Sequence, residues 1–439
     1  MSSKTRSHKP LIAVVTLGCP KNLVDSENLM GALKAADVDV QHGYSRKADI
    51  LIINTCGFIQ DAKEESIDAI LEAVEHKKHG RVQRVLVMGC LSQRYASDLQ
   101  KEIPEVDKFY GVNDLKEIIN DLNFEARREL YGERLLTTPN HYAYLKIAEG
   151  CDRTCSFCAI PLIRGKNISR NVESLLQEAE TLATHGVKEL ILIAQDLTWY
   201  GLDIYKKRML APLLSDLVKI NGIEWIRLHY TYPAAFPVDV LDVMASEPKI
   251  CKYLDIPFQH INDGLLTSMR RGITKKETYD LIETIRNKIP GIALRTSLMV
   301  GYPGETKKHF QELMDFVRDV RFERLGVFTY SEEEGTRAAS LKNNVPKLVK
   351  QERAEQIMML QQEISAEINN ARIGKVFKTI IDGNEGEYYF GRTQFDSPEI
   401  DNEVLIPTAG SELEIGSFYN ILISDSAEFD LYGEVTENI

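Results

Sequence analysis

The segment GCDRTCSFCAIP, residues 150–161, carries three cysteines at C-x3-C-x2-C spacing. Three thiolates at this spacing can hold three irons of a cubane cluster and leave the fourth iron open for a small ligand. A structural zinc ion normally takes four protein ligands in a closed tetrahedron, and no spare Cys or His lies near this run. Zinc binding and a chance cluster of buried thiols are the alternatives. The spacing favours a catalytic iron–sulfur site at Cys151, Cys155 and Cys158.

The sequence on either side of this run alternates strand and helix patterns. Strands are predicted at 143–148, 189–196, 225–230, 253–259, 293–301 and 324–330, with helices such as 172–186 and 237–247 between them. Six such units predict an open, incomplete (β/α)6 barrel over residues 137–368. Active-site groups of such folds lie at the C-terminal ends of the strands, and the triple-cysteine run follows the first strand.

The first part of the chain, residues 9–125, reads as a smaller parallel α/β domain. Cys19, Cys56 and Cys90 each end one of its predicted strands, beside a glycine. Parallel strands end at one edge of the sheet, so these cysteines are expected to converge into a second three-thiolate site. The alternative is that they are ordinary buried residues, as we expect for the seventh cysteine, Cys251.

A polar connector helix is predicted at 345–374, followed by five short strands that predict a small antiparallel β-barrel over residues 371–439. The fold class is therefore α/β with a C-terminal β-barrel. From Ile373 onward the chain has fourteen Asp and Glu against three Lys and Arg, a net of −11. The rest of the chain has 50 basic against 51 acidic side chains, so nearly all of the net charge of −12 lies in this last part.

Composition limits the class of protein further. There is no run of eighteen apolar residues and the first ten residues are polar, which predicts a soluble, cytoplasmic protein with no membrane partner. Seven cysteines, six of them in cluster-like places, indicate a reducing compartment rather than a disulfide framework.

The cysteine spacing, with Phe157 before the third cysteine, resembles the signature of radical S-adenosylmethionine (SAM) enzymes. The order of the three domains looks like the methylthiotransferase family, in which the C-terminal piece is an OB-like TRAM domain. The segments TLGCPKNLVDSE (16–27), GCDRTCSFCAIPLIRGK (150–166), YLDIPFQH (253–260) and SLMVGYPGET (297–306) resemble the RimO type, which modifies a protein. The MiaB type, which modifies tRNA, usually reads differently at the first cysteine and in the barrel.

The resemblance implies two 4Fe-4S clusters, one on each cysteine set, with SAM bound to the open iron at Cys151, Cys155 and Cys158. It implies that one SAM methylates a sulfur carried on the Cys19, Cys56 and Cys90 cluster, while a second SAM is cleaved to a carbon radical. The expected reaction adds a methylthio group to the β-carbon of an aspartate in the basic twelfth protein of the small ribosomal subunit. An electron donor such as flavodoxin is the other implied partner.

Further cofactor contacts are expected at Phe157 on the adenine, at Gln195 and Asp196 after the second barrel strand, and at Gly301 and Glu305 after the fifth. A strand-end or turn role is equally compatible with each of these residues. Arg153, Arg164 and Lys166 crowd the cysteine run and are candidates for binding carboxylates, or they belong to a solvated loop. His229 and His260 are expected to be hydrogen-bonded core residues.

The negative charge of the C-terminal barrel indicates which kind of partner it binds. A barrel of net charge −11 repels a nucleic-acid backbone and attracts a basic protein, which makes tRNA an improbable substrate. We expect six acids of this barrel to contribute to docking: Glu385, Glu387, Asp396, Glu399, Asp401 and Glu403. A merely solubilising acidic face is the plain alternative. The competing functions are a tRNA methylthiotransferase acting on a modified adenosine and a non-enzymatic iron–sulfur carrier.

Overall fold

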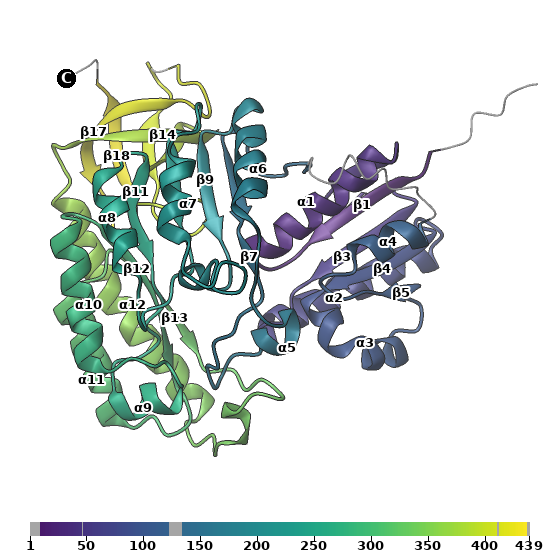
Figure 1. Cartoon of the computed structure of the whole chain (residues 1–439), viewed down its shortest axis with the longest axis horizontal. Helices are drawn as coiled ribbons and strands as arrows, with labels where there is room; N and C mark the ends of the chain where they lie inside the picture. The colour runs from purple at the N-terminus through teal and green to yellow at the C-terminus, as the bar shows by residue number, and fades with distance from the viewer. Residues whose placement is uncertain (1–8, 46, 123–133, 411, 437–439) are drawn as a thin grey trace, which may run out of the picture. The chain divides into compact units, whose positions relative to one another are not determined.

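A computed structural model describes residues 9–45, 47–122, 134–410 and 412–436 (Figure 1). The expected ends of the first domain, at 123–125, and of the C-terminal barrel, at 437–439, lie outside these ranges. The chain divides into two compact units. The first contains the residues up to Thr137 together with Ala159–Lys166, and the second contains Thr138–Cys158 and the residues from Asn167 onward. No helix in the described ranges is long and apolar enough to cross a membrane.

The first unit is built on a parallel five-stranded sheet of order β2-β1-β3-β4-β5. Its strands are β1 (Leu11–Thr16), β2 (Asp39–His42), β3 (Ile50–Thr55), β4 (Arg84–Gly89) and β5 (Lys108–Phe109). Its helices are α1 (Pro20–Ala35), α2 (Gln60–Lys78), α3 (Cys90–Glu102), α4 (Leu115–Asp121) and, from the later segment, α5 (Ile160–Arg164). The parallel α/β prediction is confirmed.

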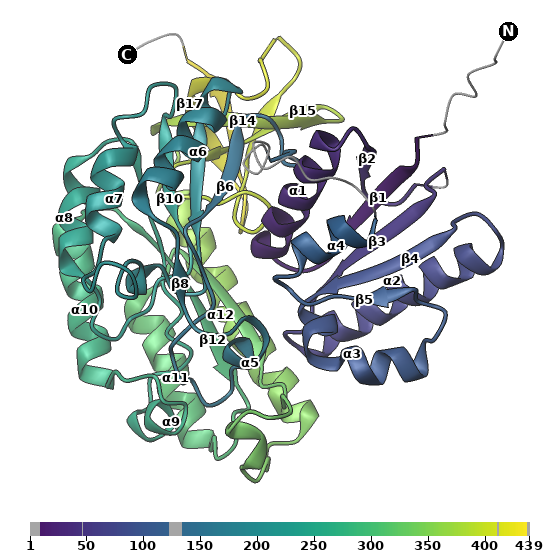
Figure 2. The same ribbon diagram turned by 45° about the vertical axis from the view of Figure 1, so that its right-hand side comes forward.

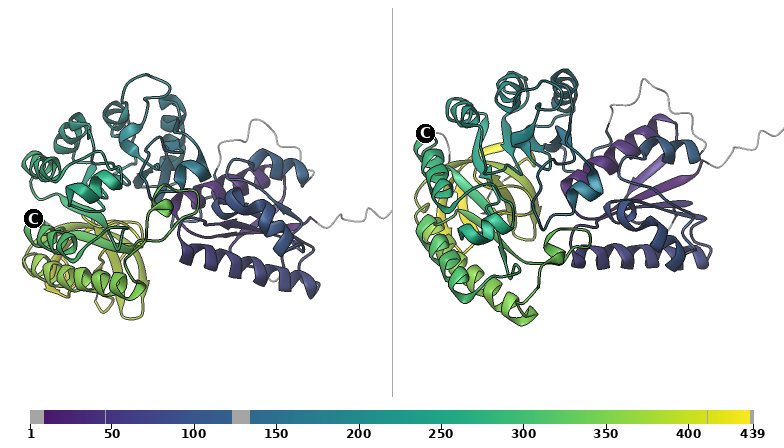
Figure 3. Two further views of the ribbon diagram at one scale, coloured as in Figure 1. Left: turned by 90° about the horizontal axis from the view of Figure 1, so that it is seen from below. Right: turned by 60° about the horizontal axis from the view of Figure 1, so that its bottom comes forward.

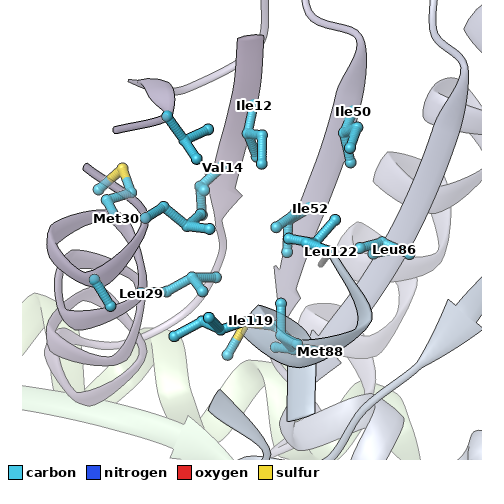
Figure 4. Close-up of a cluster of buried hydrophobic side chains, with 14 of the residues drawn as sticks. Ile12, Val14, Leu29, Met30, Ile50, Ile52, Leu86, Met88, Ile119 and Leu122 are labelled. Carbon is cyan, nitrogen blue, oxygen red and sulfur yellow. The ribbon is translucent and has the colours of Figure 1, made fainter. Parts of the chain in front are cut away.

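Two apolar cores cover the two faces of this sheet. One packs α1 and α4 on side chains of β1, β3 and β4 such as Ile12, Ile52 and Met88 (Figure 4). The other packs α2 and α3 on the alternate side chains of the same strands, among them Ile53 and Val87. Because side chains alternate across a strand, a central strand buried on both faces shows a continuous apolar run, as β3 does from Ile50 to Ile53.

The second unit contains a parallel six-stranded sheet whose strands lie in sequence order from β6 to β13. They are β6 (Tyr142–Lys146), β9 (Glu189–Ile193), β10 (Trp225–Leu228), β11 (Ile250–Asp255), β12 (Ala293–Val300) and β13 (Arg324–Thr329). Among the described residues, β6 pairs only with β9 and β13 only with β12, so the predicted open barrel is confirmed. The short strands β7 (Ala148–Glu149) and β8 (Ile168–Ser169) form a separate pair.

Helices cover the outer side of the curved sheet (Figure 3). They are α6 (Val172–Thr184), α7 (Leu210–Leu217), α8 (Val238–Ser246), α10 (Lys275–Lys288) and α11 (Lys307–Val320), whereas α9 (Asp263–Ser268) lies at the ends of the strands (Figure 1). The predicted connector is the helix α12 (Lys347–Asn370), which packs along β13. Its buried side chains include Ile357 and Ile364, so it is part of the barrel wall rather than a free linker.

The C-terminal barrel is closed, in the order β14-β15-β16-β18-β17. The strands are β14 (Val376–Glu385), β15 (Tyr388–Thr393), β16 (Val404–Pro407), β17 (Phe418–Ser426) and β18 (Leu431–Val435). Four neighbouring pairs are antiparallel, as predicted, and the pair β16–β18 is parallel. A closed ring with an odd number of strands cannot alternate direction all the way round, so one parallel pair is required.

This C-terminal barrel packs on the N-terminal ends of the open barrel's strands, within the same unit (Figure 2). The contact is apolar around Trp225, Tyr253 and Phe418, and it encloses Cys251, whose prediction as a buried thiol is confirmed. Buried ion pairs surround this apolar patch: Arg227 with Glu189, Arg392 with Glu189, Arg324 with Asp396, and Arg295 with Asp401.

Two of the six acids that were predicted to contribute to docking, Asp396 and Asp401, are therefore not on the surface. Asp396 accepts hydrogen bonds from Arg324 and Thr393, and Asp401 accepts one from the Tyr253 hydroxyl at 2.7 Å. Both side chains are almost fully buried. Burying a carboxylate is stable only with a charge or hydrogen-bond partner, and the arginines of the open barrel supply it. The docking prediction for Asp396 and Asp401 is wrong.

Candidate active site

The triple-cysteine loop leaves the C-terminal end of β6 through β7 and turns at Gly150, whose φ of +79° belongs to the left-handed region that glycine tolerates. Main-chain hydrogen bonds hold the loop: Ser156 N–H donates to the Met269 carbonyl at 3.0 Å and the Ala338 N–H donates to the Ser156 carbonyl at 2.7 Å. The Ser156 hydroxyl is 2.9 Å from that of Tyr302. The loop is thus fixed at the end of the barrel where the sequence places the active site.

One of the three thiols has two polar partners that the sequence did not reveal. Arg271 Nη1 donates to Cys155 Sγ at 3.3 Å, and the Tyr232 hydroxyl lies 3.5 Å from the same sulfur. The Arg271 guanidinium also lies over the Tyr232 ring, at 4.3 Å from its centroid. Hydrogen-bond donors aimed at a sulfur stabilise a metal-bound thiolate, so the surroundings of Cys155 fit a cluster ligand.

Arg153 is held beside the loop by two aromatic rings. Its guanidinium lies 4.1 Å from the Trp199 ring centroid and 3.9 Å from that of Tyr232, and its Nε donates to Asp196 Oδ2 at 2.8 Å. Asp196 also accepts from the backbone and hydroxyl of Thr198, so it begins the 3-10 turn at 197–199. Arg153 and Asp196 both lie at the site, where they hold each other in place.

The other predicted cofactor residues lie at or near the same strand ends. Gln195 donates to Glu149 Oε1 at 2.6 Å. Phe157 packs against the cluster of Leu265, Met269, Tyr302, Tyr330 and Ala338. The Gly301 N–H donates to Glu305 at 2.8 Å, and Arg353 donates to Glu305 at 2.5 Å. Contact with a cofactor stays a prediction for each of these residues.

His229 and His260 are core histidines, as predicted. His229 Nε2 lies 2.8 Å from the Ser397 hydroxyl, and His260 Nδ1 accepts from the backbone of Ile261 and Asn262. Desolvation lowers the pKa of His260 to about 3, so this ring is neutral in the folded protein.

The second cysteine set lies in the first unit, at the C-terminal edge of its sheet. Cys19 is the residue before α1, Cys56 follows β3, and Cys90 begins α3. The three cysteines approach one another closely enough to influence one another's charge. The three cysteines therefore lie near one another, and their action as one three-thiolate site stays a prediction.

Two glycines make this convergence possible. A Cβ atom on Gly18 would lie 2.7 Å from Cys56 Cβ and 2.9 Å from its Sγ. A Cβ on Gly57 would lie 2.8 Å from the Leu91 Cα and 3.0 Å from the Cys90 carbonyl carbon. Any larger residue at either position would push the cysteine-bearing turns apart.

Burial raises the pKa of Cys90 to about 12 and that of Cys151 to about 11. Buried thiols of this kind become thiolates when a metal supplies the compensating charge. In the described ranges, no three or more Cys, His, Asp or Glu side chains surround one point as a single metal ion requires. A cubane cluster spreads three thiolates over three irons, and cluster binding by either cysteine set stays a prediction.

Arg164 is expected near the set of Cys151, Cys155 and Cys158, but it is found beside the set of Cys19, Cys56 and Cys90. The helix α5 packs on α3 in the first unit, where Ala159 and Ile163 contact Cys90 and Val112. Lys166 is an exposed residue of the same segment. The expectation rested on sequence proximity to Cys158, which does not determine the unit in which a side chain lies.

Sequence profiles of known families match the three parts of the chain. Residues 11–111 match the uncharacterized protein family UPF0004, residues 145–317 the radical SAM superfamily, and residues 373–436 the TRAM domain. The second profile matches the open parallel barrel, which carries a three-cysteine loop after its first strand. This combination defines a radical SAM enzyme, a class that uses SAM and a 4Fe-4S cluster.

Relatives with curated names are similar over nearly the whole chain. The ribosomal protein uS12 methylthiotransferase RimO of Christiangramia forsetii is 59% identical over 426 residues, 97% of this chain and 94% of that protein. Those of Flavobacterium psychrophilum and Cytophaga hutchinsonii are 56% and 52% identical over 97% and 98% of this chain, and 98% and 99% of their own. The chain therefore belongs to the RimO family of radical SAM methylthiotransferases.

Solved structures share the fold at low sequence identity. TsrM of Kitasatospora setae, a radical SAM methyltransferase solved with cobalamin and a [4Fe-4S] cluster, has a TM-score of 0.56 and 14% identity, covering 84% of this chain and 77% of that one. The cobalamin-dependent radical SAM enzyme OxsB has a TM-score of 0.53 and 13% identity, covering 81% and 56%. At these identities the similarity supports the fold alone.

Proposed function

We propose that this enzyme adds a methylthio group to the β-carbon of an aspartate in ribosomal protein uS12. The observation that carries the proposal is the 59% identity to a RimO protein over nearly the full length of both chains. The β C–H bond of an aspartate is too strong for side-chain acid–base chemistry at neutral pH, which is why a carbon-radical oxidant is required. We place the reaction in the cytoplasm, with an electron donor such as flavodoxin.

In this proposal each cysteine set holds one 4Fe-4S cluster. Cys151, Cys155 and Cys158 would hold the cluster that binds and cleaves SAM, and Cys19, Cys56 and Cys90 a second cluster for sulfur transfer. When bound, the clusters supply an open iron for SAM and a site for the sulfur. The residues of the chain orient the ligands: Arg271 and Tyr232 fix Cys155, and the Asp196–Arg153 pair braces the loop that contains Cys151 and Cys155.

The C-terminal barrel is the proposed docking surface for the basic substrate protein. Its exposed acids in the described ranges are Glu385, Glu387, Glu399, Glu412, Glu414, Asp425, Glu428 and Glu434. A shallow groove of about 380 Å³ on this barrel is lined by the rings of Tyr388 and Tyr432 and by Asp425 and Glu434. Carboxylates beside aromatic faces suit Lys and Arg side chains.

The position of this surface restricts what it can do. The C-terminal barrel packs on the strand starts of the open barrel, whereas the triple-cysteine loop follows the strand ends. The docking acids therefore do not form part of the reaction site. In the proposal they capture a basic region of uS12 other than the segment that carries the modified aspartate.

The test is mass spectrometry of uS12 and of total tRNA from a strain that lacks this gene, before and after complementation. We expect uS12 to lose the mass of a methylthio group and to regain it with the parent gene, while tRNA stays unchanged. Loss of a tRNA modification instead would assign the MiaB type of activity. Complementation by a variant lacking Cys151, Cys155 and Cys158 would contradict any radical SAM role.

A further inference from the structure

The Arg164 side chain is buried within the first unit, only 1% exposed. Its Nη2 donates to Asn22 Oδ1 at 2.5 Å, and its Nη1 lies 3.1 Å from Asp25 Oδ2. The Cys90 thiol donates to the same Asn22 Oδ1 at 3.6 Å, and the charge of Arg164 acts on this thiol. A buried, permanently charged group therefore faces a predicted cluster ligand.

Asn22 connects this guanidinium to the turns that carry the other two cysteines. Its Nδ2 donates to the Leu17 carbonyl at 2.8 Å and to the Thr55 carbonyl at 3.1 Å. Leu17 lies two residues before Cys19, and Thr55 directly precedes Cys56. One side-chain amide thus holds both turns, while its oxygen is fixed by Arg164.

We propose that Arg164 is a positioning residue for the second cluster, acting through its charge beside Cys90 and through Asn22 on the turns of Cys19 and Cys56. The inference rests on the proposed function, because it requires a cluster on these three cysteines. Three thiolates bring negative charge into a largely buried site, and a guanidinium next to them offsets part of that charge. Net charge and hydrogen bonds to the sulfurs set the reduction potential of an iron–sulfur cluster.

The alternative is that Arg164 only forms a structural ion pair with Asp25. A role through charge predicts that changes at Arg164 and at Asp25 shift the reduction potential of the cluster in opposite directions. Removing the positive charge with Arg164→Gln should make the reduction potential of the cluster more negative. Removing the negative charge with Asp25→Asn takes away a carboxylate beside Arg164 and should make the potential more positive. If the pair were only structural, both changes would loosen α5 in the same way.

The experiment uses the full chain with Cys151, Cys155 and Cys158 replaced by Ala, so that a single cluster remains. The protein is reconstituted anaerobically with iron and sulfide, its iron content is measured, and its cluster is titrated against dithionite with redox mediators, followed by electron paramagnetic resonance. Arg164→Gln, Arg164→Lys and Asp25→Asn are compared. The control is Arg134→Gln, because Arg134 is a buried arginine of the same unit that pairs with Glu27 instead.

The expected result is about four irons per chain, with the potential lowered in Arg164→Gln, raised in Asp25→Asn and close to the parent in Arg164→Lys and Arg134→Gln. If Arg164→Gln loses its cluster, retention by Arg164→Lys supports the role of charge, and loss from both overturns it. Equal potentials in all variants that hold a cluster would also overturn it. Absence of iron from the parent triple-Ala chain would refute the second cluster itself, and the inference with it.

Discussion

Arg392 in β15 and Glu189 at the start of β9 form an ion pair 2.8 Å long, with the two side chains 2% and 0% exposed. Glu189 also pairs with Arg227, and Arg392 with Asp382. One continuous line of buried charges thus joins the C-terminal barrel to the open barrel. Losing one member leaves a buried charge without its partner, which costs much more than the pair itself contributes.

Replacing Arg392 by Ala should destabilise the joined barrels by about 3–5 kcal/mol, because Glu189 and Asp382 would both lose a charged partner. Trp225 reports on this junction because its ring lies 4.8 Å from that of Phe418, and a Trp199→Phe background leaves it as the only tryptophan. Unfolding in urea is followed by its fluorescence. The control is Lys378→Ala, which removes the exposed pair with Glu224 and should cost at most about 1 kcal/mol. Equal losses in the two variants would contradict the prediction.

Acid should loosen the same junction. Burial alone would raise the pKa of Glu189, Asp382 and Asp396, but their arginine partners hold all three below the usual carboxylate values. A lowered folded-state pKa contributes stability that is present above the unfolded pKa of about 4 and is lost as the pH falls through the folded value. The raised pKa of Asp401 opposes this effect. We expect Trp225 fluorescence to be constant near neutrality and to change below about pH 4; a transition near neutrality would refute this assignment.

Arg271→Gln should reduce SAM cleavage by about 10–100-fold, the usual effect of losing a hydrogen bond to a metal ligand. The assay is 5′-deoxyadenosine formed per chain, together with the iron content. Arg270 is the matched control, because it is adjacent in sequence and exposed. If Arg270→Gln and Arg271→Gln lost activity equally, the contact with Cys155 would not be the cause.

The two cysteine sets should separate in function. Ala at Cys151, Cys155 and Cys158 should abolish 5′-deoxyadenosine formation, whereas Ala at Cys19, Cys56 and Cys90 should preserve cleavage and stop sulfur transfer. The parent chain should bind about eight irons and each triple variant about four, one cubane for each set. About four irons in the parent would show that only one set holds a cluster.

Charge reversal on the exposed docking surface should weaken capture of uS12. Glu385→Lys, Glu387→Lys and Glu434→Lys combined should slow association, with a smaller difference at high salt because exposed charges are screened. SAM cleavage without substrate should be unchanged. Reversal of Glu283 and Glu363, which are exposed on α10 and α12, is the control. An unchanged rate of uS12 modification at low salt would exclude this surface from docking.

Most strand positions and the two cysteine sets were predictable because hydrophobic periodicity and Cys–Gly pairs are local signals. The strand β2 could not be predicted from the sequence, because its four residues are mostly exposed and show no apolar pattern. Charge counting placed Asp396 and Asp401 on the surface because a count does not distinguish a solvated acid from one buried against an arginine. Arg271 and Asn22 were missed because their partners are distant in sequence: 116 residues separate Arg271 from Cys155.

The segment Ala159–Lys166 has a consequence for how this protein can be taken apart. It belongs to the first unit although it is encoded within the second, so the backbone passes between the units three times. A fragment ending at Thr137 would leave Cys90 and Val112 without the apolar cover of Ala159 and Ile163, and Asn22 without Arg164. Neither unit is therefore a transferable module. A gene fusion or split that joins this N-terminal unit to a foreign barrel must also carry over the eight residues that follow Cys158.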